Sequence, residues 1–131
     1  MNDARRELGH RGERMAEAYL QQKGLRIVER NYRTARGEID LVAWDGDVLV
    51  FVEVRTRSGL RYGSALESIT WQKQKKLREM ALTYMQAKMI SVRQFRFDVV
   101  GIQYHTGKAN DRANMDITVQ APVITHVEYA F

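Results

Sequence analysis

Two acidic residues and one basic residue interrupt apolar stretches near the middle of the chain. Asp40 lies within Gly37–Trp44, and Glu53 and Arg55 lie within Val48–Arg55. A carboxylate among apolar residues is costly unless it is paired with a cation, hydrogen-bonded or bound to a metal ion. Two such carboxylates with a neighbouring cation have the makings of a divalent-metal or acid–base site.

The turn Asp45-Gly46-Asp47 separates the two stretches, and an Asp-Gly turn between apolar runs predicts a β-hairpin. Pairing of its strands would bring Asp40 and Glu53 together. Glu38 and Asp40 share one face of the first strand. In the second strand valines alternate with Phe51, Glu53 and Arg55, as expected in a sheet covered on both faces. An isolated acid here would more often form an ion pair, but two acids and a base favour a functional site.

Length and composition limit the class of protein. The chain has 131 residues, which predicts one domain spanning 1–131, and it has no Cys, which excludes disulfides and thiolate metal sites. Its longest apolar run, Val48–Val52, is far shorter than the ~20 residues of a membrane-spanning helix. The N-terminal residues lack the apolar core of a signal peptide. Together these features predict a cytoplasmic protein.

The charge balance favours an anionic partner. The formal net charge is +5, and Arg outnumbers Lys. The planar guanidinium suits phosphate, so nucleic acid is the first candidate, and a basic protein without such a partner is the alternative. Arginines are concentrated beside the hairpin, at Arg30, Arg33 and Arg36 before it and at Arg57 and Arg61 after it. We expect salt-sensitive binding through these two segments, because phosphate contacts release counterions.

The first helix is predicted over residues 4–23, where apolar residues recur at three- and four-residue spacings and Gly24 follows as a C-terminal cap. Gly9 and Gly12 are unfavourable inside a helix. Either the regular helix begins near Gly12, or another part of the chain approaches its backbone there. Glu13 lies at the edge of the apolar stripe, and the pattern alone favours a solvated acid.

The second helix is predicted over residues 70–88, with Thr70 as its N-cap. Its apolar stripe begins at Leu77, and one turn earlier the same stripe reaches Lys73. We therefore expect the Lys73 amine to point towards the carboxylates, within reach directly or through one water. The alternative is a stem that lies along the core with its amine in water.

Strands are predicted over residues 25–31, 37–44, 48–55 and 95–104, with a weak final strand over 123–129. Short connections predict an antiparallel meander for the first three. A whole helix joins the third to the fourth, which predicts a parallel, right-handed crossover. The expected fold is an α/β mixed sheet flanked by helices. His105 and His126 lack metal-ligand spacing and are interpreted as structural.

Several motifs together resemble the YraN-type bacterial family over nearly the full chain. They are Gly12-Glu13, Asn31-Tyr32-Arg33, Gly37-Glu38-Ile39-Asp40-Leu41, Phe51-Val52-Glu53-Val54-Arg55-Thr56-Arg57, Lys73 and Arg96-Phe97-Asp98-Val99-Val100. That family is similar to the restriction-endonuclease-like superfamily and, within it, to Holliday-junction resolvases. The resemblance implies an αβββαβ core, which agrees with the order of elements above, and the dimeric assembly of the resolvases.

The resemblance also implies a site. Asp40, Glu53 and Glu13 would ligate Mg²⁺ or Mn²⁺. The superfamily pattern has Lys where this chain has Arg55, and a guanidinium stays protonated, so it binds phosphate but cannot act as a general base. Lys73 is the candidate to compensate.

Two functions remain. One is a metal-dependent endonuclease that hydrolyses the DNA backbone, including branched or structured DNA. The alternative is a catalytically weak or inactive nucleic-acid-binding or repair accessory module on a nuclease scaffold. Substitution of Arg55 by Lys distinguishes them, since a large gain in cleavage would indicate a weakened enzyme.

Overall fold

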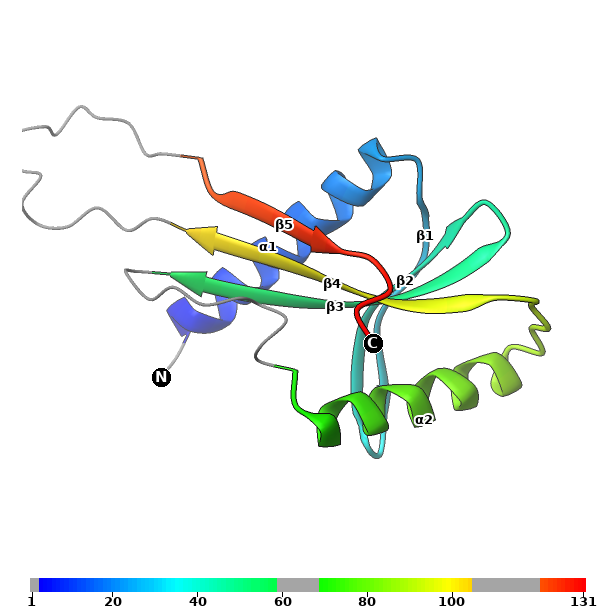
Figure 1. The fold of residues 1–131 in the computed structure, drawn as a ribbon. Helices are drawn as coiled ribbons and strands as arrows, with labels where there is room; N and C mark the ends of the chain where they lie inside the picture. Colours follow the sequence, from blue (N-terminus) through cyan, green and yellow to red (C-terminus); the bar gives the residue numbers. More distant parts are fainter. Residues whose placement is uncertain (1–2, 59–68, 105–120) are drawn as a thin grey trace, which may run out of the picture.

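The computed structural model describes residues 3–58, 69–104 and 121–131. Two helices and five strands follow one another in these residues (Figure 1): α1 (Asp3–Gln22), β1 (Arg26–Thr34), β2 (Gly37–Asp45), β3 (Val48–Ser58), α2 (Trp71–Ala87), β4 (Phe95–Tyr104) and β5 (Val123–Val127). The order αβββαβ and most element bounds agree with the sequence-based prediction.

The strands form one mixed sheet in the spatial order β1-β2-β3-β4-β5. The first three strands pair antiparallel, β4 pairs parallel with β3 across α2, and β5 pairs antiparallel with β4. The predicted meander and the parallel β3–β4 connection are therefore confirmed. In the hairpin, the register places Leu41 opposite Val52.

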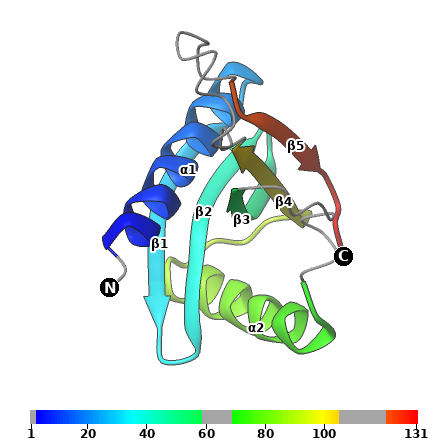
Figure 2. The ribbon, with the colours of Figure 1, turned by 90° about the vertical axis from the view of Figure 1, so that its left-hand side faces the viewer.

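One helix covers each face of the sheet (Figure 2). Alternate residues of β3 enter the two cores, with Leu49 and Phe51 on the α2 side and Val50 and Val52 on the α1 side. This is the covering on both faces that its valine-rich sequence predicts. The α2 stripe of Leu77, Met80, Ala81, Tyr84 and Met85 is buried, as its helical spacing predicts.

The two glycines of α1 lie inside a continuous helix, so the close approach expected at Gly12 is the correct alternative. A Cβ atom built on Gly12 would lie 2.1 Å from the Thr56 Oγ1 atom of β3. The missing side chain therefore lets α1 sit directly against β3. After α1, Gly24 adopts φ +98°, the left-handed conformation that favours glycine at a helix end.

The first strand is longer than predicted. Residues 32–34 were expected in a basic connection, but β1 continues to Thr34. The reason is tertiary: the Tyr32 ring packs edge-on against Tyr84 of α2, with ring centroids 4.9 Å apart. The turn between β1 and β2 thus lies beside α2 (Figure 2). Arg36 in this turn forms an ion pair with Glu79 of α2. At Asn31, φ is 49°, so the backbone leaves regular strand geometry there.

Thr70 caps α2 as predicted: its side-chain oxygen accepts a hydrogen bond from the Lys73 backbone N–H at 3.1 Å. None of the helices formed by the described residues combines the length and apolar character needed to cross a membrane. Arg61 and His105 lie outside the described residues.

Candidate metal centre

The site lies where β2 separates from β3. The two strands pair only as far as Leu41 and Val52, whereas β3 stays paired with β4 up to Ser58. Asp40 is the first β2 residue beyond the paired segment, and its Oδ2 atom accepts a hydrogen bond from the Val54 N–H of β3 at 2.7 Å. The Asp40 side chain thus bonds to the β3 backbone where strand pairing has ended. This hydrogen bond holds the Asp40 carboxyl group at the point where the strands separate.

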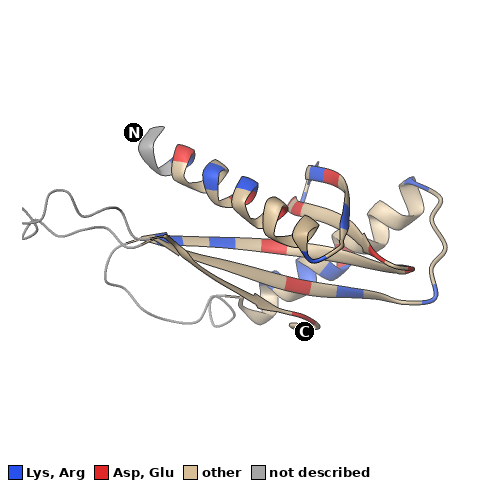
Figure 3. Ribbon diagram, turned by 90° about the horizontal axis from the view of Figure 1, so that it is seen from above, with Lys and Arg blue, Asp and Glu red and all other residues tan. Residues whose placement is uncertain are grey.

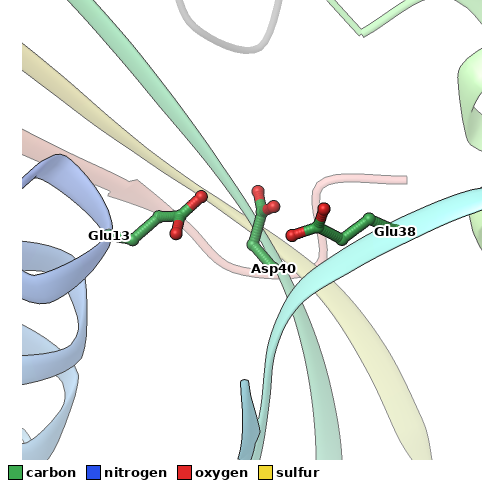
Figure 4. Close-up of side chains that lie close together, drawn as sticks. All are labelled: Glu13, Glu38 and Asp40. Atoms are coloured by element: carbon green, nitrogen blue, oxygen red, sulfur yellow. The ribbon is translucent and has the colours of Figure 1, made fainter. Parts of the chain in front are cut away.

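Three carboxylates from two elements meet there. Oxygen atoms of Glu13 on α1 and of Glu38 and Asp40 on β2 all lie within 4.8 Å of one another. The three side chains point towards a common space (Figure 4). Asn31 joins two of them, because its Nδ2 donates to Glu38 Oε2 at 2.6 Å and to Glu13 Oε1 at 3.2 Å.

Glu53 lies beside this trio with two cations. Its side chain is only 8% exposed, and its Oε2 atom is 3.8 Å from Lys73 Nζ and 3.3 Å from Arg55 Nε. The Arg55 Nε atom is buried and has no hydrogen-bond partner among the described residues, so its contact with Glu53 is an ion pair without hydrogen-bond geometry. The guanidinium is positioned by the charge of Glu53, and its Nε atom is shielded from solvent.

Burial dominates the electrostatics of the site, and negative charge from neighbouring carboxylates adds to it. Burial, reinforced by the nearby carboxylates of Glu53, Glu13 and Glu38, raises the pKa of Asp40 to about 8. Burial also raises the pKa of Glu53, although Lys73 and Arg55 oppose the shift. The carboxylates therefore lack sufficient positive charge around them in the metal-free protein.

The donor set fits a hard divalent cation. Mg²⁺ and Mn²⁺ prefer carboxylate oxygen and water, and the trio presents three carboxylates, with His10 Nδ1 3.8 Å from Glu13 Oε1 at its edge. A cation would also offset the burial and the neighbouring negative charge that raise the pKa of Asp40.

The predicted site residues come together, with one unforeseen addition. Glu13 and Asp40 meet in the trio, Glu53 lies next to it, and the Lys73 amine lies on the Glu53 side as expected. Glu38 was not predicted as a ligand, although it was placed on the same strand face as Asp40; that i, i+2 relation was the available signal. Asn31 also escaped prediction, because its contacts depend on the local bend of β1.

The predicted nucleic-acid-binding arginines differ in how they are held. Arg30 pairs with Glu17, and Arg36 pairs with Glu79. Arg33 lies 3.7 Å from Glu38, and the buried Nε of Arg57 lacks a hydrogen-bond partner among the described residues. Acidic and basic positions are interspersed along α1 and the sheet (Figure 3), so the basic residues do not form an uninterrupted stripe.

Comparison with known proteins places these residues in a family. The model of the "Uncharacterised protein family UPF0102" matches residues 12–102. A UPF0102 protein of Pelotomaculum thermopropionicum is 50% identical over 104 residues, which cover 79% of this chain and 87% of that protein. One from Rhodococcus jostii is 42% identical over 124 residues, 95% of each chain. The chain therefore belongs to the UPF0102 family, the YraN type that its motifs resemble.

Proposed function

We propose that this protein is a Mg²⁺- or Mn²⁺-dependent endonuclease that hydrolyses the phosphodiester backbone of DNA, including branched or structured DNA. The observation that carries the proposal is the convergence of Glu13, Glu38 and Asp40 within 4.8 Å. Beside them, the buried carboxylate of Glu53 lies 3.8 Å from the Lys73 amine. Carboxylates can hold the metal ion for phosphodiester hydrolysis, and an adjacent lysine can stabilise the negative charge that develops on the phosphate.

Each side chain has a role consistent with its position. Glu13, Glu38 and Asp40 would hold the cation, and Glu53 would complete its acidic surroundings. Lys73 would position the attacking water and stabilise negative charge on the phosphate, while Arg55 would bind phosphate through its guanidinium. Asn31 would keep Glu13 and Glu38 in place.

The chemistry is a hydrolysis. A water oxygen forms a bond to phosphorus while the bond from phosphorus to the leaving sugar oxygen breaks, which yields a phosphate monoester and a hydroxyl end. The bound cation would neutralise charge that develops on the phosphate oxygens. DNA would reach the site through salt-sensitive contacts, to which Arg33, Arg55 and Arg57 would contribute phosphate-binding groups.

The presence of Arg55 supports a second candidate, a catalytically weak or inactive DNA-binding module on the same scaffold. Arginine cannot give up its proton at neutral pH, so turnover depends on Lys73 if the protein is an enzyme. Arg55→Lys separates the two candidates. A large gain in cleavage would identify a weakened enzyme, and the absence of cleavage in both proteins would favour the accessory module.

The test is a cleavage panel of single-stranded, duplex, flap and four-way-junction DNA with Mg²⁺ or Mn²⁺. Wild type should cut at least one substrate, and Asp40→Asn should lose cleavage and most Mn²⁺ binding in calorimetric titration. Asp47→Asn is the matched control, because Asp47 is an exposed acid on the β2–β3 turn. Equal Mn²⁺ binding by wild type and Asp40→Asn would remove Asp40 from the site. DNA affinity that does not change with salt would exclude the phosphate contacts.

A further inference from the structure

A pocket lies directly beside the carboxylates, between α1 and the end of β3. Its volume is about 260 Å³, and it is lined by Leu8, Gly9, Glu13, Val54, Arg55 and Thr56. Glu13 also belongs to the carboxylate trio, so the pocket and the candidate metal centre have this residue in common and lie side by side. Whatever occupies the pocket would lie next to any group bound at the carboxylates.

The separation of β2 from β3 leaves this space open. Beyond Val52, the β2-facing edge of β3 has no strand neighbour among the described residues, while the opposite edge remains paired with β4. On the other wall, Gly9 lies on the same face of α1 as Gly12 and Glu13. A Cβ atom at Gly9 would meet nothing within 4 Å, so the absence of a side chain keeps the pocket empty rather than relieving a clash.

The lining suits a nucleoside with an attached phosphate. Leu8 and Val54 offer apolar contacts for a base or sugar, and the Thr56 hydroxyl offers a polar one. Arg55 also lines the pocket, and its guanidinium lies against Glu53, with Nε 3.3 Å from Glu53 Oε2. The volume lies just below the roughly 300–1,000 Å³ typical of small-ligand sites, so the pocket is too small for a base pair and suits at most a single nucleotide.

We infer that this pocket receives one unpaired nucleotide of the DNA strand, adjacent to the phosphate at the carboxylates. The inference rests on the proposed function and makes it more specific. A nucleotide that is already unpaired enters without the cost of unstacking and unpairing a base from a duplex. Single-stranded, flap or branch-point positions are therefore the expected substrates, and continuous duplex is disfavoured.

Binding can be tested without cleavage. The probe is single-stranded trithymidylate, added to ¹⁵N-labelled protein with Ca²⁺ as the oxygen-seeking cation. Wild type should show chemical-shift changes at the amides of Gly9, Val54 and Thr56. A trinucleotide whose central residue lacks its base should lose most of these changes. No binding by wild type, or shifts confined to residues away from the pocket, would overturn the inference.

Filling the pocket is the decisive comparison. Gly9→Leu should fold, because its Cβ meets no neighbour, and should weaken trinucleotide binding at least tenfold. Ala18→Leu is the matched control, an exposed position on the same helix that should bind like wild type. Leu8→Trp, at the residue before Gly9, would also fill the pocket and replaces Gly9→Leu in the binding test if that variant does not fold. If Gly9→Leu and Leu8→Trp both bind the trinucleotide as tightly as wild type, the pocket is not the nucleotide site.

Failure of this inference differs from failure of the nuclease proposal. If wild type binds the trinucleotide in the pocket but cuts no DNA, the nuclease proposal fails and the nucleotide site stands. If Gly9→Leu still cuts flap DNA at the wild-type rate, the nuclease proposal stands and the pocket assignment is wrong.

Discussion

At the scale of single residues, the candidate site is defined by charge that the fold does not neutralise. Asp40 is surrounded by three other carboxylates, and its principal hydrogen bond comes from a neutral backbone N–H. A fold gains no stability from bringing such groups together unless a cation binds or one carboxyl keeps its proton. The acidic cluster therefore needs a compensating cation or a retained proton, and this need is the physical basis of the metal-binding proposal.

The raised pKa of Asp40 makes the stability of the metal-free protein depend on pH. Because burial and neighbouring acids raise the pKa from 3.8 to about 8 in the folded state, the folded protein holds this proton more tightly than the unfolded chain. The free energy of unfolding should then fall as pH rises between these two values and level off above the higher one.

Asp40→Asn should remove this dependence, since an amide oxygen still accepts from Val54 but carries no charge. In chelator, the variant should be more stable than wild type at pH 8.5 by more than about 1 kcal/mol, with a smaller difference at pH 5. Urea unfolding at both pH values measures it. Parallel pH profiles for the two proteins would contradict the assignment.

Lys73 is the second residue whose role can be tested alone. Its amine lies 3.8 Å from Glu53, so Lys73→Ala should lower DNA cleavage by roughly a hundredfold while leaving DNA affinity nearly unchanged. Lys76→Ala, on an exposed position of the same helix, is the control and should cut normally. An equal loss of cleavage and affinity in Lys73→Ala would reduce Lys73 to a phosphate contact.

At the scale of elements, the separation of β2 from β3 creates both the acidic site and the pocket. The hairpin and its register follow from the Asp-Gly turn and the alternating pattern, whereas Asp40 and Glu53 lie just beyond the last paired residues, Leu41 and Val52. The point where pairing stops is not encoded locally. It depends on contacts with α2, such as Tyr32 against Tyr84, and on the Asn31 bend. Sequence therefore predicted the carboxylates on the hairpin but not the inclusion of Glu38.

The two glycines of α1 allow an element-scale test, because they have different surroundings. Gly12→Ala should destabilise the protein by about 1–3 kcal/mol, since its Cβ would lie 2.1 Å from Thr56 Oγ1. Gly9→Ala should stabilise it by roughly 1 kcal/mol through helix propensity, because its Cβ meets nothing.

Urea unfolding of both variants measures the contrast. Thr56→Ala should rescue much of the Gly12→Ala loss, because it removes the Oγ1 atom. If Gly12→Ala is as stable as Gly9→Ala, α1 does not pack against β3 as described.

At the scale of the whole molecule, a buried ionic network ties the later elements to the earlier ones. Asp98 of β4 accepts hydrogen bonds from Arg96 Nε at 2.9 Å and from the Tyr129 backbone N–H at 3.2 Å, and its Oδ2 lies 2.8 Å from His126 Nε2 of β5. Arg96 continues the network to Asp45 at the hairpin turn. His126 extends the network to Lys23, which lies just after α1: the His126 Nδ1 atom is 3.1 Å from the Lys23 amine.

The sequence predicted the order of the elements, since that order follows from local patterns and connection lengths. It could not predict this network, because its members lie far apart in the chain and meet only once the sheet is complete. The Arg96–Val100 motif contributed to the family resemblance, and His126 was interpreted as structural without a known partner. Its buried contact with Asp98 now supplies that partner.

The last prediction follows from the burial of this network. Although burial opposes it, hydrogen bonding from His126 and Arg96 holds the pKa of Asp98 below its ordinary value. Its contribution to stability should therefore be complete above about pH 4 and be lost as pH falls further. Asp98→Asn would place an amide N–H₂ against donors of Arg96 or His126 and leave buried positive charge unpaired.

Such a loss costs about 3–5 kcal/mol, a large share of the roughly 5–15 kcal/mol that stabilises a typical domain. Urea unfolding at pH 7 should show it for Asp98→Asn, whereas Asp47→Asn, an exposed acid on the hairpin turn, should change stability by less than about 0.5 kcal/mol. Near pH 2 the gap between Asp98→Asn and wild type should narrow, because both then lack the charge. A variant as stable as wild type at pH 7 would mean that the apolar cores, rather than the Asp98 network, hold β5 against the sheet.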